Sequence, residues 1–263
     1  IARALARARA PGPPSRADGA DRIGAACGCA AVIVLLEHVD AATGAVVAAA
    51  LGATAAALFS SAARVPARSS WALCAVLSLC AVGNALSPAP PLRPGWVKGV
   101  REDPAAFAFV RWNTHSRVTV SHAVPIPPMV WARGRNAPNE LFTPIVPRQI
   151  LIDGAAATFL TAEGSALNKH AWIDWDISSF AHRLRPTGPT AVIGVGGGRD
   201  IIAAARTGHR PIVGLELNQD IVELHRGPLR SEGAILDIPG VELHATEARR
   251  FLTDDSRSYS VIA

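Results

Sequence analysis

Residues 190–206 decide the fold, and they read Thr190-Ala-Val-Ile-Gly-Val-Gly-Gly-Gly-Arg-Asp-Ile-Ile-Ala-Ala-Ala-Arg206. The first part is small or β-branched and uncharged, which is typical of a buried strand. The glycine-rich stretch Gly194 to Gly198 predicts a tight turn, and the apolar stretch from Arg199 predicts a helix that opens directly after it. A second apolar run, 211–217, predicts another strand, so the segment is a βαβ unit.

The glycine turn and a downstream carboxylate predict a ligand that contains adenosine. Glycines remove the Cβ atoms that would keep a ligand from the backbone, and a helix start offers unpaired N–H groups. Glu216 lies near the end of the second strand, 22 residues after Gly194, where a carboxylate can accept both ribose hydroxyl protons. A turn with a purely structural role is the alternative.

The spacing of the glycines distinguishes between adenosine ligands. A dinucleotide fingerprint requires Gly-x-Gly-x-x-Gly, but its sixth position here is Arg199 and the third glycine comes one place early, at Gly198. The pattern Gly-x-Gly-x-Gly is instead that of S-adenosylmethionine-dependent enzymes. Further on, 241–247 predicts a third strand that ends in Glu247, where an adenine amino group would lie, and a fourth strand starts at Tyr259. The predicted cofactor-binding residues are Gly194, Gly196, Gly198, Asp200, Glu216 and Glu247.

The N-terminal third is much more apolar than the rest of the chain. The whole chain of 263 residues is 49% hydrophobic and 18% charged, with a mean hydropathy of +0.24. Ala41 to Ser60 and Trp71 to Ser87 are charge-free, and a shorter apolar run covers Ile23 to Leu36. A bilayer core takes about 20 residues of helix, so we expect transmembrane spans at about 23–39, 41–60 and 71–87. A pair of buried helices in a soluble protein is the alternative.

Composition also sets the domain boundaries. Residues 1–92 form the membrane region, and residues 93–103 form a linker. The boundary is set by the proline-rich stretch from Ser87 to Gly95, which cannot continue a helix. Residues 104–184 are predicted to be a small β domain with a connecting helix, and residues 185–263 to be the nucleotide-binding domain. Because the chain opens on Ile1 and closes in the middle of an apparent strand, we expect a fragment that is truncated after strand four and inactive by itself.

The middle part carries weaker local signals. Asp153-Gly154 predicts a hairpin turn, and 172–184 predicts a helix capped by Asp174 or Asp176. The four histidines of this part have no metal-ligand spacing and are expected at the surface: His115, His122, His170 and His182. No metal site is predicted. All four cysteines lie in the apolar runs, where they are typical packing residues.

Five motifs give the chain a resemblance to a known family. They are Arg111-Trp-Asn-Thr-His-Ser-Arg-Val118, Ile150-Leu-Ile-Asp-Gly154, Val192-Ile-Gly-Val-Gly-Gly-Gly-Arg-Asp200, Gly214-Leu-Glu-Leu-Asn218 and Thr246-Glu-Ala-Arg-Arg-Phe-Leu252. The chain resembles the spermidine synthase-like (polyamine aminopropyltransferase) family, in its bacterial membrane-fused branch. The resemblance implies a small β domain followed by a Rossmann-like, class I methyltransferase-type α/β domain that binds decarboxylated S-adenosylmethionine or its thioether product.

Carried over from that family, Glu216 would hold the ribose hydroxyls and Glu247 would replace an aspartate at the adenine. Three family features are missing. The acidic residue of the glycine loop falls on Gly197, the Tyr-His-Glu polyamine motif has only Phe180-Ala-His182 as its counterpart, and the catalytic aspartate would lie beyond Ala263. The catalytic residue is therefore unassigned. Fewer carboxylates weaken the expectation of a polyamine acceptor more than that of an S-adenosyl ligand.

The resulting functional expectation is a membrane-anchored transferase that moves an alkyl group from sulfur to an amine. The alternatives are an S-adenosylmethionine-dependent methyltransferase and a non-catalytic nucleotide-binding domain of a transporter or sensor. Expected partners are a small-molecule amine and membrane lipid; a homodimer is left open, and scattered arginines argue against nucleic acid. Arginine counts over three spans place the large domain outside the cell, whereas an S-adenosyl ligand places it in the cytoplasm. We give precedence to the ligand argument. The expected protein is therefore a multi-pass protein of the cell membrane whose large domain faces the cytoplasm.

Overall fold

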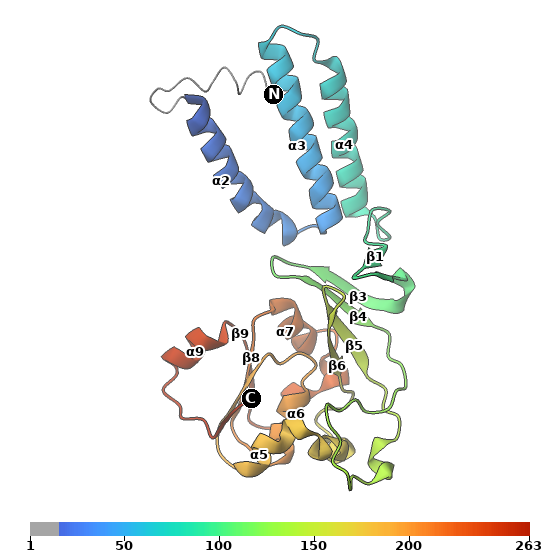
Figure 1. Ribbon diagram of the computed structural model, residues 1–263, viewed down its shortest axis with the longest axis vertical. Coiled ribbons are helices and arrows are strands. Elements are labelled where there is room, and N and C mark those ends of the chain that lie inside the picture. Colours follow the sequence, from blue (N-terminus) through green and yellow to red (C-terminus); the bar gives the residue numbers. More distant parts are fainter. Residues whose placement is uncertain (1–15) are drawn as a thin grey trace. The chain divides into compact units, whose positions relative to one another are not determined.

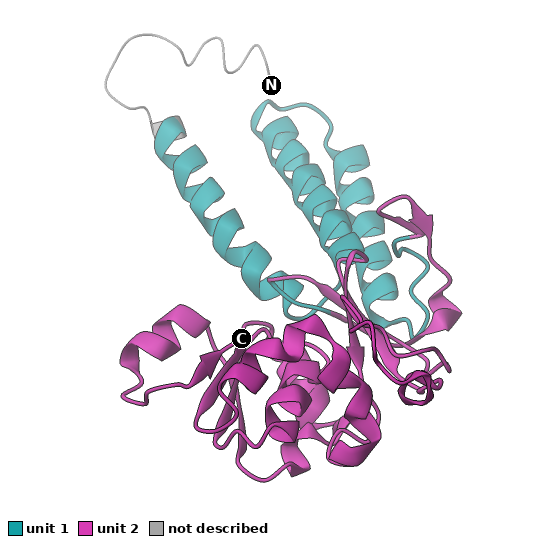
Figure 2. Ribbon diagram, turned by 60° about the horizontal axis from the view of Figure 1, so that its bottom comes forward, with its two compact units in different colours: residues 1–94, 112–114 teal, residues 95–111, 115–263 magenta. Residues whose placement is uncertain are grey.

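The computed structural model describes residues 16–263, with side chains from residue 18 onward. This part of the chain divides into two compact units (Figure 2). Unit 1 contains residues up to Pro94 together with Trp112–Thr114, and unit 2 contains Gly95–Arg111 and His115–Ala263.

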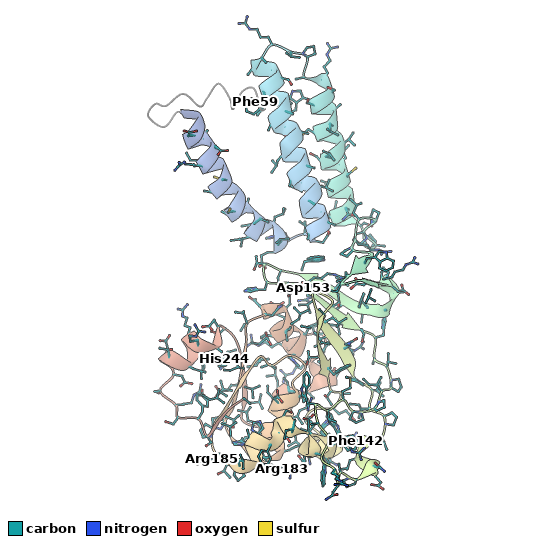
Figure 3. The ribbon with its side chains drawn as sticks, in the orientation of Figure 1. Phe59, Phe142, Asp153, Arg183, Arg185 and His244 are labelled. Atoms are coloured by element: carbon teal, nitrogen blue, oxygen red, sulfur yellow. The ribbon has the colours of Figure 1, made fainter. Side chains whose placement is uncertain are left out.

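Unit 1 consists of three helices, α2 (Arg16–Leu36), α3 (Ala41–Ala62) and α4 (Arg68–Leu86), which are visible in Figure 1. All three are long and apolar enough to cross a membrane. Large apolar side chains point outward from them: Phe59, labelled in Figure 3, is 73% exposed and Leu79 is 72% exposed. Such surfaces are unfavourable in water and suited to lipid.

Small residues and one polar link join α3 to α4. Ala50, Ala53 and Ala57 are buried in α3, and small side chains allow close approach of two helix backbones. The Asn84 amide on α4 donates to the Thr43 hydroxyl on α3 at 2.8 Å, and the Thr43 hydroxyl donates to Asp40 at 2.7 Å. Asp40 also caps α3 by accepting from the Thr43 N–H at 2.9 Å. The buried polar atoms of this link therefore have partners.

Unit 2 begins with short elements and an antiparallel sheet. The sheet has the order β3-β4-β5-β6, with β3 (Phe107–Trp112), β4 (Arg117–Ser121), β5 (Arg148–Ile152) and β6 (Ala156–Leu160). The predicted turn at Asp153-Gly154 joins β5 to β6, and both residues have positive φ, 51° and 67°. The shorter elements are β1 (Trp96–Val97), β2 (Val100–Arg101) and the 3-10 helices Pro104–Ala106 and Asn139–Phe142.

The second sheet of unit 2 is parallel and has the order β10-β7-β8-β9. Its strands are β7 (Thr190–Ile193), β8 (Ile212–Glu216), β9 (Val241–Ala245) and β10 (Val261–Ile262). The first strand in the chain lies between the second and the fourth, which is the order of a Rossmann-like α/β fold. The predicted fold class is therefore confirmed: apolar N-terminal helices, a small β region and a Rossmann-like domain.

Helices α6 (Arg199–Arg206), α7 (Gln219–Arg226) and α9 (Ala248–Asp254) connect these parallel strands (Figure 1). The core includes Val192, Ile201, Ile202, Ile212 and Leu243, so the apolar run that follows the glycine turn packs against the strands on either side of it. The short helix α8 (Arg230–Gly233) and the 3-10 helix Ile235–Asp237 lie between α7 and β9.

The prediction of one continuous helix over 172–184 is wrong. This region contains a 3-10 helix at Leu167–Trp175, another at Ile177–Ser179 and the short helix α5 at Phe180–Leu184. The break falls at Asp176, which has the extended angles φ −91° and ψ 138° and caps the second 3-10 helix through the Ser178 N–H. A carboxylate with several partners thus interrupts a helical pattern.

The expectation of surface histidines is correct for two residues and wrong for two. His115 and His122 are exposed, but His170 and His182 are only 2% and 1% exposed. His182 packs edge-on against the equally buried His209, with ring centroids 5.1 Å apart. An imidazole has an apolar ring and few polar atoms, so it can be buried in a core without a functional role.

Candidate functional site

The candidate site is the turn between β7 and α6, at the carboxyl end of the first parallel strand. Gly194, Gly196 and Gly198 have φ values of 77°, 50° and 88°. Side chains disfavour this left-handed region, which explains the three glycines of the motif in physical terms. The turn lies next to the switch point between β7 and β10, where ligands of open α/β sheets bind.

Three N–H groups of the turn donate to acceptors within the protein. The Gly196 N–H donates to Glu216 Oε2 at 3.1 Å, the Gly197 N–H to Thr158 Oγ1 at 3.1 Å, and the Gly198 N–H to the Val195 carbonyl at 2.8 Å. A pyrophosphate could take these donors only by breaking protein hydrogen bonds. The turn is thus poorly suited to a dinucleotide and better suited to a ligand without phosphate.

Glu216 ends β8 and is 7% exposed. Its Oε1 accepts from the Asn218 N–H at 3.0 Å, while its Oε2 accepts from the Gly196 N–H. Each carboxylate oxygen has a second lone-pair site, so these bonds leave capacity for two further donors such as ribose hydroxyls. The sequence-predicted Glu216 is therefore in contact with the sequence-predicted turn.

Strand β6 lies directly against the turn at Gly197. A Cβ atom at Gly197 would be 1.9 Å from the Phe159 carbonyl oxygen, and one at Gly196 would be 3.0 Å from Thr158 Oγ1. No side chain fits at residue 197 unless the β6 backbone moves. An acidic side chain at residue 197 is therefore excluded by the packing of β6.

His225 supports the turn from α7, and sequence reasoning missed it. Its Nε2 lies 2.7 Å from the Gly196 carbonyl oxygen, and the residue is 1% exposed. Burial lowers the pKa of His225, so the neutral imidazole donates through Nε2 to that carbonyl. A lone histidine near the end of a helix carries no sequence signal for such a role.

The other predicted residues lie at the same edge of the sheet. Asp200 is in the first turn of α6, where burial raises its pKa. Glu247 is exposed and caps α9, accepting from the backbone N–H groups of Arg249 at 3.1 Å and Arg250 at 2.8 Å. It follows β9 by two residues, and β9 pairs with β8 at Glu216 and Ala245. One predicted carboxylate thus ends β8, and the other follows the neighbouring strand β9.

A cavity of about 650 Å³ adjoins the glycine turn. Gly194, Val195, Arg199 and Asp200 line it from the turn and α6. The opposite walls come from β6 and from the preceding loops, and they include the aromatic side chains Trp131, Phe159 and Trp172. The cavity therefore combines a mainly apolar wall with a charged pair at the start of α6.

Arg199 is held by a buried carboxylate. Its guanidinium donates to the Asp176 carboxylate and to the Ser178 hydroxyl. The Asp176 side chain is fully buried and also accepts from the backbone N–H groups of Trp131 and Ser178, both at 3.0 Å. Asp176 thus ties a cavity wall to the first residue of α6, which is why the predicted helix breaks there.

The residues that the structure describes contain no group of three or more His, Cys, Asp or Glu side chains able to hold a metal ion.

The fold and the site define a Rossmann-like α/β protein with a glycine turn and an acidic second strand. Two crystal structures are similar to it: spermidine synthase from Thermotoga maritima, and a spermidine synthase in complex with the transition state analogue AdoDATO. Each is 14% identical to this chain with a TM-score of 0.37, and each match covers 60% of this chain. The matches cover 47% and 46% of those proteins, so the chain spans about half their length. No family model and no curated protein matches the chain.

Proposed function

We propose that the chain is a membrane-anchored, spermidine synthase-like transferase that binds an S-adenosyl ligand and transfers an alkyl group to an amine. The observation that carries the proposal is the buried Glu216 carboxylate, which bonds to Gly196 of the turn while keeping lone pairs for two ribose hydroxyls. A carboxylate at this place binds ribose in many Rossmann-like proteins.

The proposed ligand is decarboxylated S-adenosylmethionine or S-adenosylmethionine. Gly194, Gly196 and Gly198 allow it to approach the backbone, and Glu247 is assigned to the adenine amino group. The hydrogen bonds already made by the N–H groups of Gly196, Gly197 and Gly198 support a ligand without pyrophosphate. The family's polyamine-binding acid is not part of this proposal, because β6 occupies its place at Gly197.

The proposed reaction is an in-line displacement. The lone pair of a neutral amine nitrogen forms a bond to the alkyl carbon next to the sulfonium, while the carbon–sulfur bond breaks. Its electron pair stays on sulfur and gives a neutral thioether, and the new ammonium releases one proton. The sulfonium is already a good leaving group, so the protein contributes mainly the position of the reactants.

The proposed location is the cell membrane. Helices α2, α3 and α4 would cross it, with membrane lipid against their exposed apolar side chains and with unit 2 on the cytoplasmic side, where S-adenosyl ligands occur. The length and apolar composition of these helices support this assignment.

Calorimetric titration of the detergent-solubilised chain tests the nucleotide site. The titrants are S-adenosylmethionine, its decarboxylated form and methylthioadenosine, with Glu216→Gln as the variant and the exposed Glu140→Gln as its matched control. Loss of charged hydrogen bonds, each worth about 1.5–3 kcal/mol, is expected to weaken binding by at least about tenfold in Glu216→Gln only.

The ligand preference separates the related functions. Tighter binding of the decarboxylated form or of methylthioadenosine supports aminopropyl-type transfer, whereas preference for S-adenosylmethionine supports a methyltransferase. If none of the three binds, the turn is structural and the proposal fails.

A further inference from the structure

The cavity beside the glycine turn exposes apolar surface at its mouth. Trp131 is 83% exposed and Met129 is 58% exposed, whereas Trp172 deeper in the cavity is only 3% exposed. Large apolar side chains around a concave site mark a place where an apolar partner or ligand binds. A volume of about 650 Å³ corresponds to a small molecule rather than to a protein segment.

The charges of the cavity leave one carboxylate unbalanced. Arg199 and Asp200 are the ionisable residues among those that line it, and the Arg199 guanidinium is paired with the buried Asp176. The carboxylates of Asp176 and Asp200 and the guanidinium of Arg199 together carry a net charge of minus one. One cationic group of a ligand near Asp200 would neutralise this net charge. The remaining walls of the cavity would contact apolar atoms of the same ligand.

The cavity and the proposed ribose site lie on different parts of the turn. Gly194 and Val195 line the cavity, whereas the Glu216 carboxylate bonds to Gly196 and is not among the lining residues. A ligand held by Glu216 and passing along the turn would bring its other end toward the cavity. The cavity is therefore the natural location of the second reactant.

We infer that the acceptor is a hydrophobic monoamine, bound in this cavity with its amino group at Asp200 and its apolar part against Trp131, Phe159 and Trp172. This inference rests on the proposed function and names its acceptor class. It also assigns Asp200 to the acceptor rather than to the nucleotide. A polyamine fits poorly, because each further ammonium would lie among apolar walls without a carboxylate partner.

In the reaction, the acceptor must be a neutral amine when it attacks. The Asp200 carboxylate is positioned to accept a hydrogen bond from the amino group and to take the proton that the product ammonium releases. The partly buried start of α6 favours this proton transfer, since burial stabilises the neutral carboxylic acid relative to the carboxylate.

A matched pair of probes tests the acceptor class by binding alone. Hexylamine and hexamethylenediamine have the same carbon chain and differ by the second amino group. Each is titrated into the detergent-solubilised chain, with tryptophan emission as the readout and empty micelles as the blank. Hexylamine is expected to bind at least about tenfold more tightly, because the diamine must bury an unpaired charge. The emission change should be greatly reduced in Trp131→Phe.

Two variants and a control locate the binding. Asp200→Asn removes the charge at nearly constant shape and should weaken hexylamine about tenfold, while hexan-1-ol should be unaffected. Ala156→Phe fills the cavity from β6 and should abolish the binding of hexylamine. Ala105→Phe makes the same change at an exposed alanine outside the cavity and should leave it unchanged.

The outcomes separate this inference from the proposed function. Equal or tighter binding of the diamine or of spermidine, or hexylamine binding that neither Asp200→Asn nor Ala156→Phe changes, overturns the monoamine acceptor. Methylthioadenosine binding that depends on Glu216 would still support the transferase in that case. If methylthioadenosine does not bind while hexylamine behaves as expected, the cavity binds amines but the proposed reaction fails.

Discussion

Glu216 Oε2 accepts a hydrogen bond from the Gly196 N–H at 3.1 Å, so the carboxylate that ends the second parallel strand holds the turn that follows the first. The Gly196 carbonyl in turn lies 2.7 Å from His225 Nε2. Buried side chains thus hold both peptide groups of Gly196: Glu216 bonds to its N–H, and His225 bonds to its carbonyl oxygen. Such preorganisation lowers the cost of ordering the turn when a ligand binds.

Packing of β6 against the turn predicts that residue 197 tolerates no side chain. Gly197→Ala should destabilise the chain by about 3 kcal/mol or more, because its Cβ would overlap the Phe159 carbonyl. Gly95→Ala is the control, since a Cβ there meets nothing within 4 Å, and it should change stability by less than about 0.5 kcal/mol. Urea unfolding in detergent measures both; equal midpoints would contradict the packing.

The Arg199–Asp176 pair predicts a large effect of removing one buried charge. Asp176→Asn leaves the guanidinium without its carboxylate and should cost about 3–5 kcal/mol. The exposed pair of Lys169 and Glu163 provides the comparison, and Glu163→Gln should lower stability much less than Asp176→Asn does. Thermal unfolding of both variants makes the comparison, and similar melting temperatures would argue against Asp176 as an anchor.

Burial of His182 predicts an acid-sensitive core. Burial, reinforced by the charge of His209, lowers the pKa of His182 from 6.5 to about 4. The unfolded chain therefore binds more protons, and this contribution to stability is complete above pH 6.5 and is lost as pH falls toward 4. The slope is at most about 1.4 kcal/mol per pH unit for one group. His182→Gln should flatten the fall in unfolding free energy between pH 6.5 and 4; an unchanged slope would assign the loss to other groups.

The cysteines of the apolar helices test the membrane assignment. Cys27 and Cys29 on α2 and Cys80 on α4 are exposed side chains. In permeabilised native membranes, lipid should shield them from a charged maleimide until the sample is denatured. Ala105→Cys on unit 2 should react without denaturation, since Ala105 is exposed outside these helices. Rapid labelling of the native cysteines before denaturation would contradict a lipid-covered position.

The sequence was sufficient to predict the Rossmann-like unit, because its signals are local. The strand before Gly194, the helix after Gly198 and the apolar run that ends at Glu216 lie within 27 consecutive residues, 190–216. The three long apolar helices at the N-terminal end were predictable for the same reason. The position of Glu216 relative to the turn followed from the parallel pairing of neighbouring strands.

The rest of the site depends on residues that are distant in sequence. Nothing near Thr158 indicates that its hydroxyl accepts from Gly197, and nothing near His225 indicates that it holds Gly196. The 172–184 helix was predicted from its local pattern and is broken by the long-range partners of Asp176. Local sequence patterns predict helices and strands. Contacts between those helices and strands determine which polar side chains become buried.

The packing of β6 on the turn also bears on how the chain folds. The Gly197–Thr158 bond joins residues 39 positions apart, and the Gly196–Glu216 bond joins residues 20 positions apart. Both partners lie outside the seventeen residues, 190–206, that contain the strand, the turn and the helix. Two of its native hydrogen-bond partners lie on other elements, Thr158 on β6 of the antiparallel sheet and Glu216 on the second parallel strand, and such non-local contacts tend to slow folding. The native hydrogen bonds of the turn thus connect both sheets of unit 2.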